Sequence, residues 1–256
     1  MIRAIDINCD LGESFGAYTI GSDDEMMPVI TSANVACGFH GGDPLIMDRT
    51  VRLAGENGVR VGAHPGFPDL GGFGRREMRL SAAEVRAALI YQVGALQAFA
   101  RAHGLTLQHV KAHGALYNMA ASDAAAARAI AAAVAEIDSR LILVVLTGSA
   151  MEGAGREAGL RIAREVFGDR GYRRDGTLVR RSEAGALISD PAAVARRVVR
   201  MLSEGVVDAV DGGEVWVDPQ TICFHGDTMG APRLARAARE ALVRAGVTIA
   251  PMDQWL

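Results

Sequence analysis

The sequence contains almost no lysine: of its 27 lysines and arginines, only Lys111 is a lysine. A surface lysine can usually be replaced by arginine at little cost, but a compact ammonium whose pKa changes on burial cannot. Lys111 follows a short apolar run and lies between His109 and His113. A compositional bias need not remove every lysine, but this position favours a functional role for Lys111.

An excess of positive charge and long apolar runs are also absent. The formal net charge is -3, which offers no basic face for nucleic acid. No apolar run is long enough to cross a bilayer, and the first residues lack the basic and apolar regions of a signal peptide. The three cysteines have no CxxC spacing and fit a reducing compartment better than a disulfide framework. We therefore expect a cytoplasmic protein without a nucleic-acid or membrane partner.

Common nucleotide-binding motifs are missing. No GxxxxGK[ST] loop exists, and the single lysine lies in a different context. No GxGxxG opens a helix after a strand, because GGFG at 71–74 is typical of a turn. The sequence alone therefore gives no phosphate-binding loop.

What the chain does contain is an alternation of short β-branched runs with longer alanine- and leucine-rich stretches. This rhythm predicts parallel strands joined by crossover helices in one domain over residues 1–256. The expected strands are Ala4–Cys9, Ile30–Ala36, Arg60–Ala63, His109–Lys111, Leu141–Leu146, Arg161–Val166 and Thr221–His225. The expected helices include Pro44–Asn57, Ser81–His103, Ser122–Ile137, Pro191–Glu204 and Pro232–Ala245.

Two connections are longer than a simple turn requires, namely His64–Arg79 and Gly168–Asp190. Long irregular segments inside a domain are usually functional loops or lids. The second segment is rich in arginine and glycine, so it is either a lid over a site or a surface insertion.

Polar residues gather where the expected strands end. In parallel α/β folds these ends lie on one face, where active sites are built, and burying so many ionisable groups without a use is costly. The residues are Asn8, Asp10, Glu13, Asn34, His40, His64, Lys111, His113, Glu165, Arg170, His225 and Asp227. We expect His103 to cap a helix or lie on the surface, and His109 to pack within its strand.

Two chemistries can use this set. Histidines and aspartates can bind a divalent metal that activates water, but no local His pair is present. Alternatively, lysine and histidine can polarise a carbonyl while a carboxylate acts as general base. The residues leave both open. We assign catalysis to Lys111, Asp10, His113 and Glu165, assign substrate binding to the other members of the set, and predict no protein-bound metal.

Six segments, in chain order, resemble the signatures of the LamB/YcsF family. They are DINCDLGESFG (6–16), SANVACGFHGGDP (32–44), GAHPGFPDLGGFGRR (62–76), VKAHGALYN (110–118), REVFGDRGYRRDGTLVRR (164–181) and FHGDTMGA (224–231). Ala112 and Met229 occupy positions where proline is expected in this family. Both departures affect backbone stiffness beside the site and leave its ionisable groups unchanged.

The resemblance implies a (β/α) barrel of about seven strands, similar to the polysaccharide-deacetylase barrels. It also implies ATP-dependent ring opening of 5-oxoproline to L-glutamate in the cytoplasm, with two further subunits of the B and C type. The implied cofactor is ATP with a divalent counter-ion. Two alternatives are a stand-alone metal-dependent amide or acetyl hydrolase of the deacetylase type and a non-catalytic substrate-binding subunit.

Overall fold

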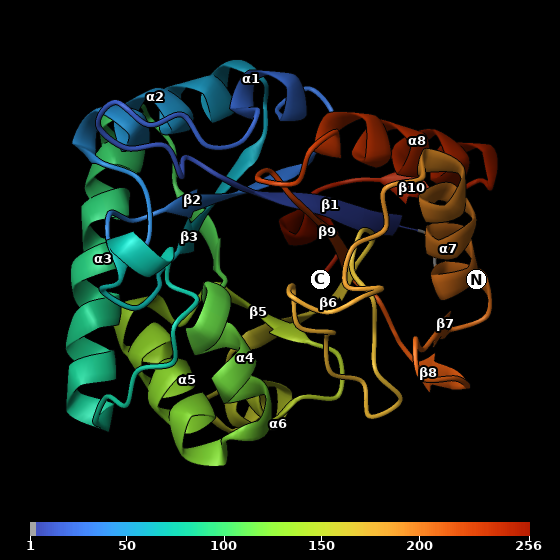
Figure 1. Ribbon diagram of the computed structural model, residues 1–256. Helices are drawn as coiled ribbons and strands as arrows, with labels where there is room; N and C mark the ends of the chain where they lie inside the picture. Colours follow the sequence, from blue (N-terminus) through green and yellow to red (C-terminus); the bar gives the residue numbers. More distant parts are fainter. Residues whose placement is uncertain (1–3) are drawn as a thin grey trace.

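Seven parallel strands close into a barrel in the computed structural model, which describes residues 4–256 (Figure 1). The strands are β1 (Ala4–Leu11), β2 (Ser32–Ala36), β3 (Arg60–His64), β4 (Leu107–Val110), β5 (Ile142–Leu146), β6 (Arg161–Phe167) and β9 (Thr221–His225). Strand β1 pairs with both β2 and β9, which closes the barrel. The short strand β10 (Thr248–Ile249) extends the sheet beside the start of β1. The predicted barrel of about seven strands is confirmed.

Helices surround the strands (Figure 1). The five predicted helices are present as α2 (Pro44–Glu56), α3 (Ala82–Ala102), α5 (Ala124–Asp138), α7 (Pro191–Ser203) and α8 (Ala231–Arg244). The sequence did not predict α1 (Asp23–Met26), α4 (Gly114–Ser122) and α6 (Ala150–Glu157). Within residues 4–256, no helix is both long and apolar enough to cross a membrane.

Helix boundaries follow from local capping. The Asp43 carboxylate accepts from the amides of Leu45 and Ile46, and Pro44 fills the first helical position of α2. At α3, Ser81 and Glu84 form a reciprocal capping box. His103 is the C-cap of the same helix, as expected from the sequence.

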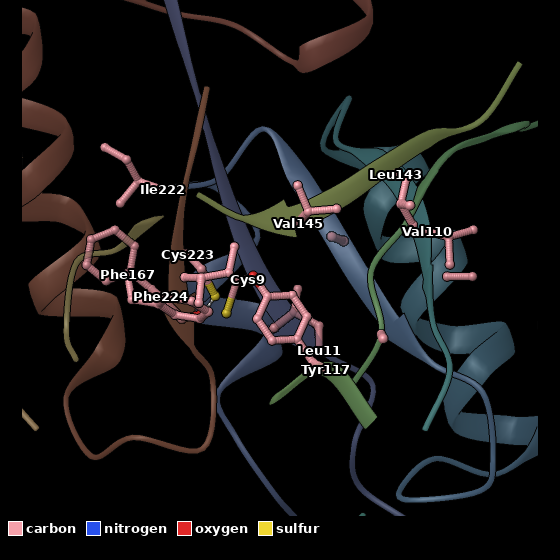
Figure 2. Close-up of a cluster of buried hydrophobic side chains, with 14 of the residues drawn as sticks. Cys9, Leu11, Val110, Tyr117, Leu143, Val145, Phe167, Ile222, Cys223 and Phe224 are labelled. Carbon is pink, nitrogen blue, oxygen red and sulfur yellow. Dashed lines mark hydrogen bonds between the residues drawn. The ribbon is translucent and has the colours of Figure 1, made fainter. Parts of the chain in front are cut away.

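The apolar core lies between the barrel and its helices. Alternate residues of β1, from Ile5 through Ile7 and Cys9 to Leu11, are buried and belong to this core. Figure 2 shows part of it, with apolar side chains from β1, β4, β5, β6, β9 and α4. Burial on this face fixes strand register, because a one-residue slip would turn every core side chain to the other face.

The opposite set of β1 residues faces a polar barrel interior. Asp6, Asn8 and Asp10 are buried and hydrogen-bond with side chains of β2 and β9 or, for Asp10, with Lys111. Space inside is tight: a methyl group at Gly62 would lie 2.1 Å from the ring of His109. His109 is therefore the packed strand residue that the sequence predicted.

The remaining elements decorate the barrel. Strands β7 (Val206–Asp208) and β8 (Glu214–Trp216) form an antiparallel hairpin, and two single-turn helices are η1 (Leu70–Gly72) and η2 (Met252–Gln254). The segment 168–190, gold in Figure 1, contains only isolated bridges. It follows β6 and lies at the end of the barrel where the candidate site is found.

Candidate functional site

A cavity of about 1030 Å³ opens at the carboxyl ends of the strands. Its lining combines strand ends, α4 and the two long connections. Six of the twelve predicted site residues line it: Asp10, His64, Lys111, His113, Arg170 and His225. The parallel strands thus bring together residues from opposite ends of the sequence, such as Asp10 and His225.

The other six predicted residues do not line the cavity. Asn8, Asn34 and Glu165 lie within the barrel, hydrogen-bonded to one another or to neighbouring interior groups. Glu13 and His40 are buried beside His64 and His113 without reaching the cavity surface. Asp227 is bound by Arg75 and Arg181.

Lys111 is held by carboxylates. Its Nζ lies 2.9 Å from Asp10 Oδ1, 2.9 Å from Glu165 Oε1 and 3.0 Å from Cys223 Sγ. Burial would lower the pKa of Lys111, but the negative charges of Asp10 and Glu165 raise it well above its ordinary value. Lys111 is therefore a fixed cation, and the contacts around Nζ suit it to positioning Asp10 more than to passing a proton.

Asp10 is the carboxylate that links this cation to the cavity. Burial favours its neutral form, but His64 and Lys111 outweigh burial and hold the pKa of Asp10 well below its usual value. Its Oδ2 lies 3.4 Å from His64 Nε2. Asp10 is therefore an ionised acceptor at the cavity floor.

A second cluster, here called the histidine cluster, consists of Glu13, His40, His64 and His113. The rings of His40 and His113 are stacked with centroids 3.5 Å apart, and His64 stands nearly perpendicular to both. His64 Nε2 and His113 Nδ1 are 3.0 Å apart. Burial raises the pKa of Glu13 and lowers the pKa values of His40 and His113.

His225, the other histidine that lines the cavity, is paired with Asp169. His225 Nδ1 lies 3.0 Å from Asp169 Oδ1, and the ring stacks on Phe167. Burial would raise the pKa of Asp169, but His225 lowers it. A histidine whose Nδ1–H is held by a carboxylate keeps Nε2 for proton exchange with a bound molecule.

Arginines surround the mouth of the cavity. Arg75 from the first long connection and Arg173, Arg180 and Arg181 from the second contribute to its lining. Arg170 is more enclosed: it donates to the carbonyls of two other residues of its own loop, and burial lowers its pKa to about 10. The mouth therefore presents guanidinium groups, which bind carboxylates and phosphates in bidentate fashion.

Three participants were missed by the sequence prediction. The hydroxyl of Tyr117 donates to Glu165, Cys223 contacts Lys111, and Arg75 binds Asp227. Tyr117 is on the unpredicted helix α4. Cys223 alternates with Thr221 and His225 along β9, so the period of two in that strand was the signal that could have placed it inside the barrel.

Comparison with known proteins agrees with this architecture. The sequence profile of the LamB/YcsF family matches residues 5–256. The 5-oxoprolinase A subunit of Natranaerobius thermophilus is 52% identical over 254 residues, covering 99% of both chains. The protein of the same name from Thermus thermophilus is 56% identical over 245 residues, covering 96% of this chain and 98% of the relative.

Solved structures give the same result. The crystal structure of the lactam utilization protein from Thermus thermophilus has a TM-score of 0.91 at 55% identity, covering 96% of this chain and 99% of that one. The peptidoglycan deacetylase PdaC from Bacillus subtilis has a TM-score of 0.50 at 13% identity, and the match covers 99% of this chain and 89% of that one. This second likeness concerns the fold alone and agrees with the expected deacetylase-type barrel. By its sequence profile, its relatives and its barrel, the chain belongs to the LamB/YcsF family.

Proposed function

We propose that this chain is the A component of an ATP-dependent 5-oxoprolinase, which opens the lactam of 5-oxoproline to L-glutamate with two partner subunits of the B and C type. The observation that carries the proposal is identity above 50% over nearly the whole chain to proteins that bear the name of the 5-oxoprolinase A component. The polar cavity at the strand ends is the place where such chemistry fits the fold.

The chemistry explains why ATP is needed. The lactam amide is stable at neutral pH, and transfer of a phosphoryl group to its carbonyl oxygen would create a good electrophile. Water would then add to that carbon, the C–N bond would break, and the nitrogen would leave with a proton as the amine of glutamate. Phosphate would depart with the former carbonyl oxygen, and a second water completes the carboxylate.

The residues of this chain have distinct parts in that scheme. His225, held by Asp169, exchanges the proton with water or with the leaving nitrogen. Asp10, fixed by Lys111, accepts a hydrogen bond from the substrate or from water. The arginines of the mouth bind the substrate carboxylate and the phosphoryl group. A cavity of about 1030 Å³ exceeds the needs of 5-oxoproline and leaves room for a second molecule.

Reconstitution tests the proposal. The purified chain is combined with its two partner subunits, 5-oxoproline and ATP, and glutamate and ADP are measured in the same samples. We expect glutamate formation only when all components are present, and little turnover by this chain alone. ATP-coupled glutamate formation by the isolated chain, or by the partners without it, would refute the proposed division of labour.

A further inference from the structure

We propose that Glu13, His64 and His113 form a binding site for one divalent transition-metal ion, such as Zn²⁺, at the edge of the cavity. The first argument is the direction of the hydrogen bonds. His64 Nδ1 donates to the carbonyl of Lys111 at 2.8 Å, and His113 Nε2 donates to the carbonyl of Phe73 at 2.8 Å. In a neutral imidazole, the other ring nitrogen then carries a lone pair.

These two lone pairs face each other. His64 Nε2 and His113 Nδ1 are 3.0 Å apart, and His64 Nε2 is also 3.4 Å from Asp10 Oδ2, so a proton held here in the metal-free chain would be replaced by a bound metal ion. The rings are inclined at 86°, so the two nitrogens approach a common point from different directions. A cation at that point removes the repulsion between the lone pairs. The outward N–H bonds to backbone carbonyls are the support that metal-binding histidines commonly have.

The spacing suits one ion. Ligands about 2.0–2.1 Å from zinc lie about 2.9–3.4 Å apart at angles from 90° to tetrahedral. The distance between the histidine nitrogens is 3.0 Å, and His113 Nδ1 is 3.5 Å from Glu13 Oε1. Two imidazoles and a carboxylate are a common three-ligand set for catalytic zinc. His64 and His113 line the cavity, so the remaining coordination position would face the cavity.

His40 orients the carboxylate and is not a ligand in this arrangement. Its ring is parallel to that of His113 within 2°, so the in-plane lone pairs of the two rings do not converge. Its Nε2 lies 3.2 Å from Glu13 Oε1, where an N–H donates to the carboxylate. In this tautomer the proton is on Nε2 and the buried Nδ1 of His40 is an acceptor. That Nδ1 has no hydrogen-bond partner, so no donor contradicts the assignment.

Charge also favours a cation here. The carboxylates of Asp10, Glu13 and Glu165 are all buried, although only Asp10 lines the cavity, and the Lys111 ammonium contacts Asp10 and Glu165 but not Glu13. A divalent ion bound to Glu13 would favour its ionised form, which burial alone disfavours. In a second set of potential ligands, Asp10, Cys223 and His225, the first two already contact the Lys111 ammonium, so we assign no metal to this set.

Metal binding by the tag-free, chelator-treated chain tests this site without partners, 5-oxoproline or ATP, so its outcome is independent of the proposed function. ZnCl₂ is titrated calorimetrically, and metal content is measured after gel filtration. We expect one Zn²⁺ per chain in the wild type and in the control variant His103→Gln. The variants His113→Gln and Glu13→Gln should bind at least about 100-fold more weakly, judging from the 10- to 100-fold losses seen when only supporting partners are removed.

Folding of each variant is checked by circular dichroism. If the ligand variants do not fold, the wild type still decides: Zn²⁺ should raise its melting temperature. Its Co²⁺ form should absorb as a nitrogen- and oxygen-ligated ion, without a thiolate band from a cysteine. A wild-type chain that takes up no stoichiometric metal, a thiolate spectrum, or undiminished binding by folded His113→Gln and Glu13→Gln would overturn the proposal.

Discussion

Replacing Lys111 with methionine should destabilise the fold strongly. The ammonium lies 2.9 Å from both Asp10 and Glu165, and the lysine side chain is only 3% exposed. Removing one partner of a buried ion pair typically costs about 3–5 kcal/mol, because the remaining charge stays buried without compensation. We therefore expect Lys111→Met to lower the free energy of unfolding by about this amount.

Lys111→Arg separates charge from shape. It retains the positive charge but places a larger, planar group among Asp10, Glu165 and Cys223, and overpacking of a buried site typically costs about 1–3 kcal/mol. Activity in the reconstituted complex should fall by about 100-fold, since misplacement by about 1 Å has that effect. Arg140→Lys, at an exposed position, is the matched control and should change neither the free energy of unfolding nor the activity of the reconstituted complex.

Urea denaturation followed by far-UV circular dichroism measures these effects. The double variant Lys111→Met/Glu165→Gln provides a further check, because it removes one of the two uncompensated charges. Its destabilisation should be smaller than the sum of the two single changes. If the free energy of unfolding of Lys111→Met lies within about 0.5 kcal/mol of the wild-type value, as is usual for surface substitutions, the lysine is not the structural cation inferred from its contacts.

Three further outcomes are expected. Burial raises the pKa of Asp6 from 3.8 to about 6, so the folded protein binds the Asp6 proton more tightly than the unfolded chain does. The contribution of this proton to stability is therefore full below pH 3.8 and declines as the pH rises to about 6. Across this range the free energy of unfolding of the wild type should fall by up to about 3 kcal/mol relative to that of Asp6→Asn, as measured by urea denaturation at several pH values. Parallel pH curves for the two proteins would contradict this expectation. Gly62→Ala should lower the free energy of unfolding by about 1–3 kcal/mol through its clash with an interior ring, whereas Gly94→Ala, with open space around the new methyl, should not. Asp169→Asn should lower turnover of the reconstituted complex by about 10²–10⁴-fold and alter its rate–pH profile through the orientation of His225, and an unchanged profile would exclude that role.

The sequence predicted the barrel well because its strands are marked by local patterns. Strand β9 was predicted with its observed bounds, Thr221–His225, and the helix predicted at 81–103 differs from α3 by one residue at each end. Helix α4 escaped prediction because it is short and its N-cap, His113, makes no side-chain capping bond. Helix α6 contains two glycines, which weaken a helical signal.

The site was predicted only in part, for a geometric reason. Alternation along a strand tells which side chains face the interior, but it does not give their depth along the barrel axis. Asn8 and Asp10 share the inward face of β1, yet only Asp10 reaches the cavity. Contacts between distant loops, such as that of Arg75 with Asp227, leave no local pattern at all.

The proposed function depends on proton transfer during lactam opening in the cavity at the strand ends. Its most direct test is glutamate formation by the reconstituted complex containing His225→Gln, with His103→Gln as the control outside the cavity. Glutamine can still hydrogen-bond to Asp169 but cannot exchange a proton near neutral pH. We expect an assembled complex whose turnover is lower by about 10²–10⁴-fold, with the control at the wild-type rate. Normal glutamate formation by His225→Gln would contradict it and move the chemistry to one of the partner proteins.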